Sequence, residues 1–436
     1  MTETRTLPDQ SARDRIVTDL DQSLLVEAAA GTGKTTSMVA RMTALLREGK
    51  TTVERLAAMT FTVKAAGHLR LKFETALQNA LRDEEDTHRR TALEEALRDI
   101  DRPFIGTIHA FCATLLRERP LEAGIDPDFS VIDESETAAF QQRVFRDAIR
   151  EAGDEGSALG YMLREHRVPL PALREAYQQL CQYPDVAFPG TPTAPPDLTS
   201  VHAHFVALVD DLAPHLPQEG TLGKEDGLQH LLRGVLRQRY HGPLAAVDIA
   251  ALLAPFRRGK GLVVLTCWSG SDMAAKGDVR ERVEAFASEE VLPALRRWEE
   301  YLYPQIIGHA GVIARRYHEE KLRRSLLSHD DLLLRTRDML HDHPDVRREL
   351  QQRFTHLLVD EFQDTDPVQA ELMLFLTGTN TGERDWKKLI PHPGSLFVVG
   401  DPRQSIYRFR RADITVYDTV ARILESTGAA RLHLTS

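Results

Sequence analysis

Short apolar runs alternate with longer amphipathic stretches in the first and last quarters of the chain. Six runs have the length and composition of strands buried on both faces of a parallel sheet; they occupy residues 24–26, 56–59, 104–105, 357–359, 396–399 and 432–434. Residues 37–47 and 65–77 instead repeat apolar positions with the period of a helix. This alternation predicts an α/β domain whose parallel sheet is flanked by helices and joined by right-handed crossovers.

The strand pattern is absent between residues 117 and 325, where helical periodicity takes its place. One predicted helix presents an apolar face made of Phe140, Val144, Phe145 and Ala148. A proline-rich break at 189–196 and a glycine-rich one at 259–261 subdivide the stretch. We therefore expect a large, mostly α-helical insertion at 117–325, within an α/β domain formed by residues 1–116 and 326–436.

Composition and charge narrow the class of protein. The 436 residues are 42% hydrophobic and 28% charged, and the formal net charge of −10 excludes a uniformly basic coat, although not a local basic patch for nucleic acid. Three widely separated cysteines form neither a disulfide framework nor a zinc-binding pattern. No run approaches the roughly 18 apolar residues of a transmembrane helix, and residues 1–5 lack an apolar signal core. We expect a cytoplasmic protein with no membrane partner.

The first apolar run leads into a glycine-rich turn at residues 31–35 (Gly-Thr-Gly-Lys-Thr), and a helical pattern follows. In such a P-loop, backbone N–H groups and a helix N-terminus surround the β-phosphate, while the lysine reaches the β- and γ-oxygens. The two glycines permit the tight turn, Lys34 carries the charge, and the Thr35 hydroxyl would bind Mg²⁺. The usual pattern begins with a glycine where this chain has Ala28. The turn predicts a nucleoside-triphosphate site.

Two adjacent carboxylates, Asp360 and Glu361, follow the apolar run at 357–359. At the strand end, Asp360 would coordinate Mg²⁺ and offset the charge that develops on the phosphoryl group. Glu361 is one residue further on and would orient or deprotonate the attacking water. The alternative is an acidic helix cap after an ordinary strand, which the P-loop disfavours. Together the two motifs predict hydrolysis of a nucleoside triphosphate.

Polar and aromatic residues follow the other strands at the same edge of the sheet, where open α/β sheets bind ligands. Gln404 follows the run at 396–399, and a glutamine near a γ-phosphate can sense its presence. Tyr407 and Phe409 are interleaved with arginines, which suits single-stranded nucleic acid because each stacked base contributes about 1–3 kcal/mol. The alternative is that both rings belong to the core. The same edge continues through Phe61, Lys64, Arg70 and His109.

Several motifs resemble those of the UvrD/Rep group of superfamily 1 DNA helicases. They are 7–10 (LPDQ), 60–66 (TFTVKAA), 106–111 (GTIHAF), 359–365 (VDEFQDT) and 400–407 (GDPRQSIY). The sequence of residues 26–35 (VEAAAGTGKT) and the long helical insertion look closest to the RecB/AddA branch. The resemblance implies a RecA-like P-loop NTPase domain (1A) with the insertion as subdomain 1B. It also implies ATP-dependent 3′-to-5′ translocation on single-stranded DNA and unwinding of duplex DNA in repair or recombination.

Carried over residue by residue, the resemblance assigns roles to matching positions. Lys34, Glu361 and Gln404 would be catalytic, and Thr35 and Asp360 would hold Mg²⁺. The ATP-binding positions would be Gln10 (at the adenine), Ala28, Ala29, Ala30, Gly31, Thr32, Gly33, Lys34, Thr35 and Thr36. The DNA-binding positions would be Phe61, Thr62, Lys64, Thr107, His109, Tyr407 and Phe409. Family members often have tryptophan where Phe409 stands and arginine where Thr36 stands, which implies weaker stacking and relaxed selectivity for the base.

Family members continue beyond these motifs into a second RecA-like domain, whose arginines stabilise transition-state charge. Such an arginine contributes roughly 10³–10⁵ in rate in related phosphoryl-transfer enzymes. We therefore expect the chain to be the N-terminal half of a motor that binds ATP–Mg²⁺ and hydrolyses ATP slowly alone. The expected partners are single-stranded and duplex DNA and a second subunit of a helicase–nuclease complex. The alternative is a complete nucleotide-gated DNA-binding or partner-docking subunit without motor activity.

Overall fold

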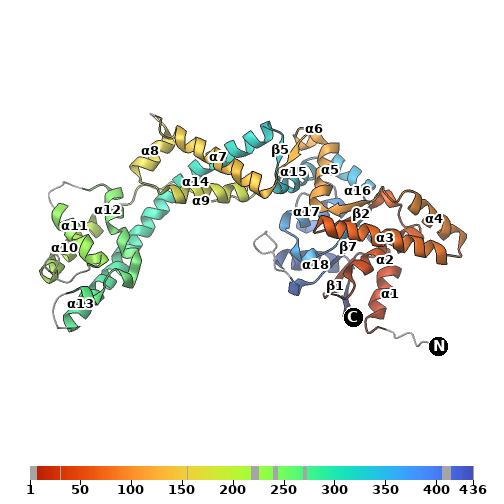
Figure 1. The fold of residues 1–436 in the computed structure, drawn as a ribbon, viewed down its shortest axis with the longest axis horizontal. Coiled ribbons are helices and arrows are strands. Elements are labelled where there is room, and N and C mark those ends of the chain that lie inside the picture. The colour runs from red at the N-terminus through yellow and green to blue at the C-terminus, as the bar shows by residue number, and fades with distance from the viewer. Residues whose placement is uncertain are drawn as a thin grey trace. The chain divides into compact units, whose positions relative to one another are not determined.

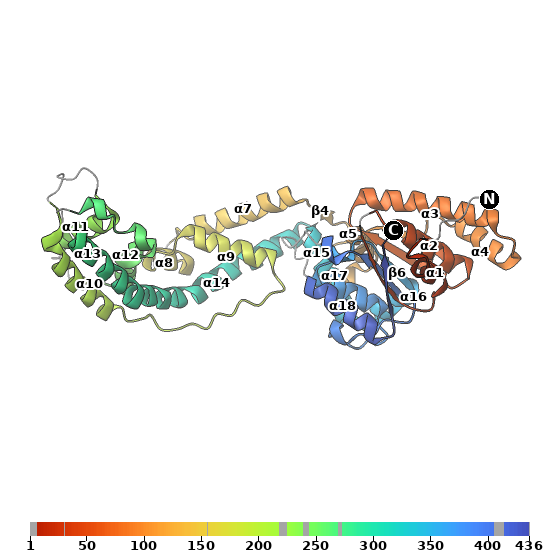
Figure 2. The same cartoon turned by 90° about the horizontal axis from the view of Figure 1, so that it is seen from below.

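The computed structural model describes residues 7–29, 31–154, 156–217, 225–238, 244–268, 273–404 and 414–435 of the chain. The chain forms two compact units, whose elements are labelled in Figures 1 and 2. The α/β unit comprises Met1–Glu134 and Arg324–Ser436, and the helical unit comprises Ser135–Arg323. The helical unit thus begins at Ser135, and the segment from residue 117 to 134 belongs to the α/β unit.

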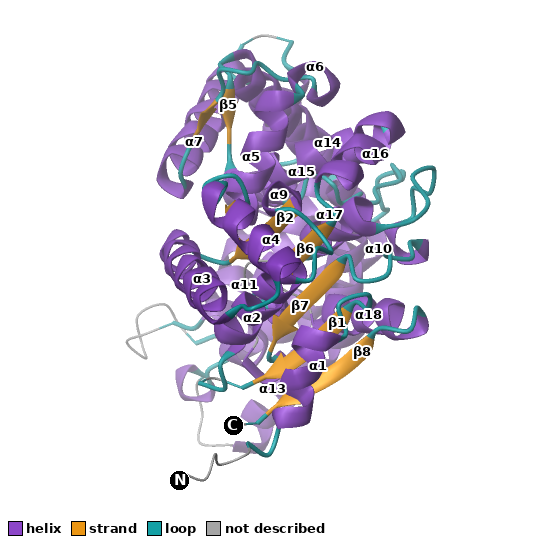
Figure 3. Cartoon of the chain, turned by 90° about the vertical axis from the view of Figure 1, so that its right-hand side faces the viewer, coloured by secondary structure: helices purple, strands orange, loops and turns teal. Residues whose placement is uncertain are grey.

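Six strands form the sheet of the α/β unit, in the order β3-β2-β6-β7-β1-β8, and every neighbouring pair is parallel (Figure 3). Their bounds are β1 Leu24–Ala28, β2 Leu56–Thr60, β3 Phe104–Thr107, β6 His356–Val359, β7 Leu396–Gly400 and β8 Ala430–Leu434. Each strand contains one of the six predicted runs, so the predicted α/β fold with a parallel sheet is confirmed. Strand β1 lies between β7 and the edge strand β8, so the turn that follows it opens at the carboxyl-end edge of the sheet, one strand away from β6 on the other side of β7.

Helices cover both faces of this sheet, as Figure 3 shows. They are α1 Gln10–Thr18, α2 Lys34–Arg47, α3 Val63–Asp83, α4 Thr87–Arg98, α5 Ile108–Glu118, α6 Pro120–Ala123, α15 His329–Asp342, α16 Pro344–Arg353, α17 Pro367–Thr377 and α18 Ile414–Ser426. Two short parallel strands, β4 Ser130–Val131 and β5 Leu326–Leu327, pair with each other at the two points where the chain leaves and rejoins the α/β unit.

Successive strand residues pack on opposite faces of the sheet. Leu24 and Val26 of β1 belong to a buried cluster that also contains residues of α1, α2, α3 and α4. Met59 of β2 lines a small apolar cavity on the other face, together with residues of α5, α15 and α17. Because both faces are covered, β1, β2, β6 and β7 are apolar at nearly every position, as expected of a parallel sheet, whereas the edge strand β8 alternates buried Leu432 and Leu434 with exposed Arg431 and His433.

The helical unit has α7 Glu134–Glu151, α8 Ala158–Glu165, α9 Leu170–Gln182, α10 Thr199–Leu212, α11 Gly227–Gln238, α12 Ala246–Leu253, α13 Met273–Phe286 and α14 Leu292–Arg323. The predicted apolar face of α7 is buried, with Phe145 packed on Tyr177 of α9 at 5.4 Å between ring centroids. Among the helices of the described residues, none is both long enough and apolar enough to cross a bilayer.

Arg41 of α2 holds the connection between α1 and β1. Its side chain is fully buried, and its guanidinium donates to the carbonyl oxygens of Ile16 at 3.0 Å, Asp19 at 3.2 Å and Gln22 at 2.7 Å. Burial lowers the pKa of Arg41 to about 10, so the side chain stays charged at neutral pH. These bonds satisfy one buried and two partly buried backbone carbonyls and fix α1 against the helix that starts at the glycine-rich turn.

We predict that Arg41→Met lowers the free energy of unfolding by roughly 3–5 kcal/mol, because the substitution leaves several buried or partly buried carbonyl oxygens without donors. Denaturant unfolding measures this loss. Arg15→Met is the matched control, since Arg15 contacts the side chains of Asp19 and Gln22 at the partly exposed surface of α1 and its loss should cost at most about 1 kcal/mol. Equal effects of the two substitutions would contradict the role given to Arg41.

Candidate functional site

The turn between β1 and α2 takes its shape from its two glycines. Gly31 has φ +82° and Gly33 has φ +88°, a left-handed conformation that residues with a Cβ rarely adopt. Gly33 caps α2, whose first residue is Lys34. The N-terminus of a 14-residue helix therefore opens directly onto the turn, in the arrangement that favours an anion. Of the other predicted positions nearby, Ala28 ends β1, Ala29 follows it directly, and Thr36 lies in the first turn of α2, whereas Ala30 lies outside the described residues.

Arg13 of α1 braces this turn. Its Nη2 donates to the carbonyl oxygen of Thr32 at 2.9 Å, and its guanidinium also forms two hydrogen bonds, of 3.0 and 3.1 Å, with the carboxylate of Asp9. Asp9 is buried and also accepts the backbone N–H of Thr435 at 2.8 Å. Gln10, on the same helix, donates to Asp14 at 2.8 Å. This brace was not predicted from the sequence, although the Asp-x-x-x-Arg spacing at the start of a helix is a signal for it.

Asp360 and Glu361 lie at the carboxyl end of β6. The N–H of Asp360 donates to the carbonyl oxygen of Met59 at 2.9 Å, which anchors the strand end to β2. Glu361 has φ +54° and ψ +41°, a left-handed conformation that costs a residue with a Cβ on the order of 1–3 kcal/mol. Its N–H donates back to Oδ1 of Asp360 at 3.0 Å. The backbone therefore turns sharply between the two carboxylates.

Both carboxylates meet the first residues of α2. Lys34 Nζ and Glu361 Oε2 form an ion pair at 2.6 Å, and these side chains are 10% and 36% exposed. The side chain of Thr35 is hydrogen-bonded to Asp360. The structure thus brings four predicted residues together, although the two members of the ion pair are 327 positions apart in the sequence.

Burial raises the pKa of Asp360 to about 6, and the neighbouring charge of Glu361 acts in the same direction. A cation bound at Asp360 would offset both the cost of burying its charge and the repulsion from Glu361. The Asp360 carboxylate and the Thr35 hydroxyl are hard oxygen donors, which Mg²⁺ prefers, and Mg²⁺ in nucleotide sites commonly takes its other ligands from phosphate and water. The residues present therefore fit Mg²⁺.

Of the other predicted edge residues, Arg70 is not at this edge: it reaches Asp101 and the carbonyl oxygen of Ile105, beside a hollow at the opposite end of the strands. Phe61 and His109 line the same small hollow as Asp360 and Glu361. Thr62 and Thr107 are the N-cap residues of α3 and α5, where their hydroxyl oxygens accept the backbone N–H groups of residues 65 and 110. Lys64 is exposed on the first turn of α3. Tyr407 and Phe409 lie outside the described residues.

Gln404 follows β7 and is part of a hydrogen-bonded chain. Its Nε2 donates to Oδ2 of Asp401 at 2.6 Å, and the N–H of Asp401 donates to Oε1 of Gln363 at 2.9 Å. No role was predicted for Gln363 or Asp401 from the sequence. Both are polar residues that closely follow a strand. The same feature in the sequence predicted Glu361 and Gln404 as site residues.

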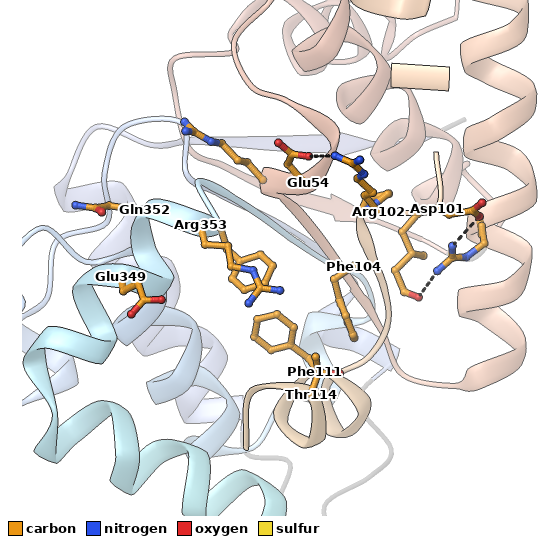
Figure 4. Close-up of a pocket in the computed structure, with 14 residues that line it drawn as sticks. Glu54, Asp101, Arg102, Phe104, Phe111, Thr114, Glu349, Gln352 and Arg353 are labelled. Carbon is orange, nitrogen blue, oxygen red and sulfur yellow. Dashed lines mark hydrogen bonds and ion pairs between the residues drawn. The ribbon is translucent and has the colours of Figure 1, made fainter. Parts of the chain in front are cut away.

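A roomier hollow, of about 780 Å³, lies at the opposite end of the strands (Figure 4). Its lining includes residues that precede or begin β2, β3 and β6, among them Arg55, Phe104 and Phe354. Figure 4 shows Glu54 paired with Arg102, at 3.1 Å, on its rim. The charged groups of this hollow largely neutralise one another. The left-handed backbone of Glu361 and the raised pKa of Asp360 occur instead at the carboxyl ends of the strands.

We predict that Asp360→Asn stabilises the metal-free protein at pH 7 by on the order of 3 kcal/mol. The pKa of Asp360 in the folded state, about 6, exceeds its ordinary value of 3.8. The charged carboxyl therefore destabilises the folded state as the pH rises from about 4, and the cost is complete above about 6. The gain in the variant should vanish below pH 4 in denaturant unfolding.

Asp19→Asn is the control of opposite sign, because a hydrogen bond from Arg15 lowers the pKa of Asp19 and the charged form stabilises the fold. That variant should lose a little stability at pH 7. A loss of stability in Asp360→Asn at pH 7 would contradict the environment described for this carboxylate.

Comparisons with known proteins agree with this geometry. A family profile described as UvrD/REP helicase N-terminal domain matches residues 9–423. A protein from Streptococcus equi subsp. zooepidemicus, named as a subunit of an ATP-dependent helicase/nuclease, is 26% identical over 434 residues, which cover 91% of this chain and 34% of the relative. Proteins of the same name from Exiguobacterium sibiricum and Alkaliphilus oremlandii are 25% and 26% identical. Their alignments cover 94% and 91% of this chain, and 37% and 35% of the relatives.

The chain spans about a third of the length of the curated relatives that it matches. The family match, by contrast, extends over nearly the whole chain, including both parts of the α/β unit and the helical unit between them. It includes the glycine-rich turn, the paired carboxylates and the loop of Gln404. The chain belongs to the UvrD/REP helicase family, as a representative of its N-terminal domain.

Proposed function

We propose that the α/β unit binds ATP–Mg²⁺ and hydrolyses the β–γ phosphoanhydride. The observation that carries this proposal is the convergence of Lys34, Thr35, Asp360 and Glu361 at one edge of the sheet. Lys34 and the N–H groups around Gly31 and Gly33 would hold the phosphates, and Thr35 and Asp360 would hold Mg²⁺, which offsets phosphate charge. The remaining positions of the proposed nucleotide site are Gln10, Ala28, Ala29, Ala30, Thr32 and Thr36.

Glu361 is the proposed general base. It would accept a proton from a water molecule, whose oxygen attacks the γ-phosphorus while the bond to the bridging oxygen breaks and ADP leaves. In the structure Glu361 is paired with Lys34 at 2.6 Å. Nucleotide phosphates would compete for Lys34 and release the carboxylate for this reaction. Gln404 would sense the γ-phosphate from the next strand.

We further propose that the chain serves an ATP-dependent DNA helicase that moves 3′ to 5′ on single-stranded DNA and unwinds duplex DNA in repair or recombination. Support comes from the family and from Phe61 and His109, which line the same hollow as Asp360 and Glu361. The proposed DNA contacts are Phe61, Thr62, Lys64, Thr107, His109, Tyr407 and Phe409. Polarity follows the family resemblance and is tested by unwinding of substrates with a 3′ or a 5′ single-stranded tail.

The 436 residues alone should hydrolyse ATP slowly. The described residues that line the hollow beside Glu361 include no arginine, although an arginine at the γ-phosphate contributes roughly 10³–10⁵ in related enzymes. We propose that another domain or polypeptide supplies it. Because the relatives are named as subunits of a helicase/nuclease, a nuclease-containing complex is the proposed assembly. Nucleotide-dependent DNA binding without turnover in the protein as its gene encodes it would instead favour a nucleotide-gated docking role.

Glu361→Gln should bind ATP–Mg²⁺ at least as tightly as the wild type, because the substitution removes the ion pair that nucleotide must displace from Lys34. Its hydrolysis should fall by about 10² or more, since the base is lost. Lys34→Ala should instead lose nucleotide affinity. Binding of a fluorescent ATP analogue and phosphate release measure the two effects, with Glu349→Gln, at the opposite end of the sheet, as the control. Weaker nucleotide binding by Glu361→Gln than by Lys34→Ala would contradict these roles.

Lys64→Ala should weaken binding of single-stranded DNA and make its salt dependence shallower by about 0.7 in the slope of log K against log salt. The lysine is exposed at the start of α3, where a phosphate can reach it. Lys50→Ala is the matched control, because Lys50 precedes β2 and pairs with Asp21 at 2.6 Å. Equal slopes for the two variants would place Lys64 away from the DNA.

A further inference from the structure

Gln363 is buried, with 3% of its surface exposed, and its side-chain amide is fully engaged between two loops. Its Nε2 donates to Oε2 of Glu361 at 2.7 Å and to Oδ2 of Asp364 at 3.2 Å. Its Oε1 accepts the backbone N–H of Asp401 at 2.9 Å. A buried amide whose donor and acceptor ends are both engaged has a fixed orientation, because a flip would place like groups against each other.

The bond to Glu361 shares its acceptor with the P-loop lysine. Oε2 of Glu361 accepts from Lys34 Nζ at 2.6 Å and from Gln363 Nε2 at 2.7 Å. A nucleotide that draws Lys34 to its phosphates removes the first donor and leaves the second. Glu361 also sits in a left-handed backbone conformation, which is unfavourable by itself and depends on such contacts to persist. Gln363 is therefore the contact that can hold the carboxylate when nucleotide is bound.

The acceptor end of the amide reaches the loop that carries Gln404. Asp401, whose N–H donates to Gln363, accepts Nε2 of Gln404 through its own carboxylate at 2.6 Å. Gly400, the last residue of β7, makes the approach feasible. A Cβ there would lie 2.6 Å from Oε1 of Gln363 and 3.1 Å from its backbone nitrogen. A continuous chain of hydrogen bonds thus links Glu361, Gln363, Asp401 and Gln404.

We propose that Gln363 is a positioning residue, which keeps Glu361 oriented toward the attacking water in the nucleotide-bound state and ties that orientation to the loop of Gln404. This inference rests on the proposed function and deepens it. The hydrogen bond from Gln363 to Glu361 persists after nucleotide has displaced Lys34 from Glu361. Gln363 itself touches neither phosphate nor water in this role. Its loss should slow the chemical step and leave nucleotide binding intact.

The experiment uses the protein as its gene encodes it and compares two substitutions. Gln363→Met removes both ends of the amide, whereas Gln363→Glu keeps an acceptor for Asp401 and loses the donor to Glu361. Each should lower kcat for ATP hydrolysis by about 10–100-fold, the loss typical when the partners that orient a metal-binding side chain are removed. KM and the affinity for a fluorescent ATP analogue should stay within about twofold of the wild type.

Gln351→Met is the matched control. Gln351 is a partly buried glutamine that donates to the carbonyl oxygens of Phe375 and Gly378 at 2.7 and 2.8 Å, and it lies on α16, before β6 begins. The control loses two hydrogen bonds of a purely structural glutamine. It should therefore keep the wild-type kcat.

A double-substitution cycle separates positioning from a general loss of structure. In a Glu361→Gln background the residual hydrolysis should be insensitive to Gln363→Met, because the group to be positioned is gone. A structural effect would lower the rate by the same factor in both backgrounds. Equal factors, or a kcat for Gln363→Met within about twofold of the wild type, would overturn the inference.

Lys34→Ala, assayed alongside, distinguishes failure of this inference from failure of the proposed function. Loss of hydrolysis in Lys34→Ala together with wild-type activity in Gln363→Met would remove only the role of Gln363. Wild-type hydrolysis in Lys34→Ala would instead remove the proposed ATP site, and this inference with it.

Discussion

The α/β unit is organised around two adjacent carboxylates at the end of one strand, of which Asp360 is buried and Glu361 is partly exposed. Asp360 is 9% exposed, and burial together with the charge of Glu361 raises its pKa to about 6. Such a pair needs a cation. Lys34 forms an ion pair with Glu361, and the Thr35 side chain is hydrogen-bonded to Asp360. The same two residues begin the helix behind the glycine-rich turn, so the phosphate-binding and the acidic halves of the site are held together electrostatically.

A parallel sheet is what makes this arrangement possible across so long a stretch of chain. Strands β1 and β6 are separated by β7 alone, so their carboxyl ends lie at the same edge although Lys34 and Glu361 are 327 positions apart. The helical unit is accommodated without disturbing the sheet, because the chain leaves and rejoins the α/β unit at β4 and β5. These short strands pair in parallel, Ser130 with Leu326 and Val131 with Leu327, and fasten the two crossings together.

The strands and the glycine-rich turn were predictable because local sequence determines them. Short apolar runs of this length fit few structures other than strands buried on both faces of a sheet. A tight turn with left-handed residues requires Gly31 and Gly33. The sequence predicts that the segment from 117 to 134 belongs to the insertion, because a strand of two residues, Ser130–Val131, is too short to show a strand pattern. The parts of the site that were not predicted depend on register between distant segments. Gln363 acquires its role from Asp401 and from the absence of a side chain at Gly400, a relation that residue types alone do not reveal.

The central claim is that ATP–Mg²⁺ and single-stranded DNA act on one shared edge of the sheet. The most direct test is the affinity of the hydrolysis-deficient Glu361→Gln protein for single-stranded DNA, measured with and without saturating ATP–Mg²⁺. Coupled sites should change that affinity by about 5–150-fold, DNA should change the affinity for ATP by the same factor, and the additional substitution Lys34→Ala should abolish the effect. Identical DNA affinities with and without bound nucleotide would contradict the account.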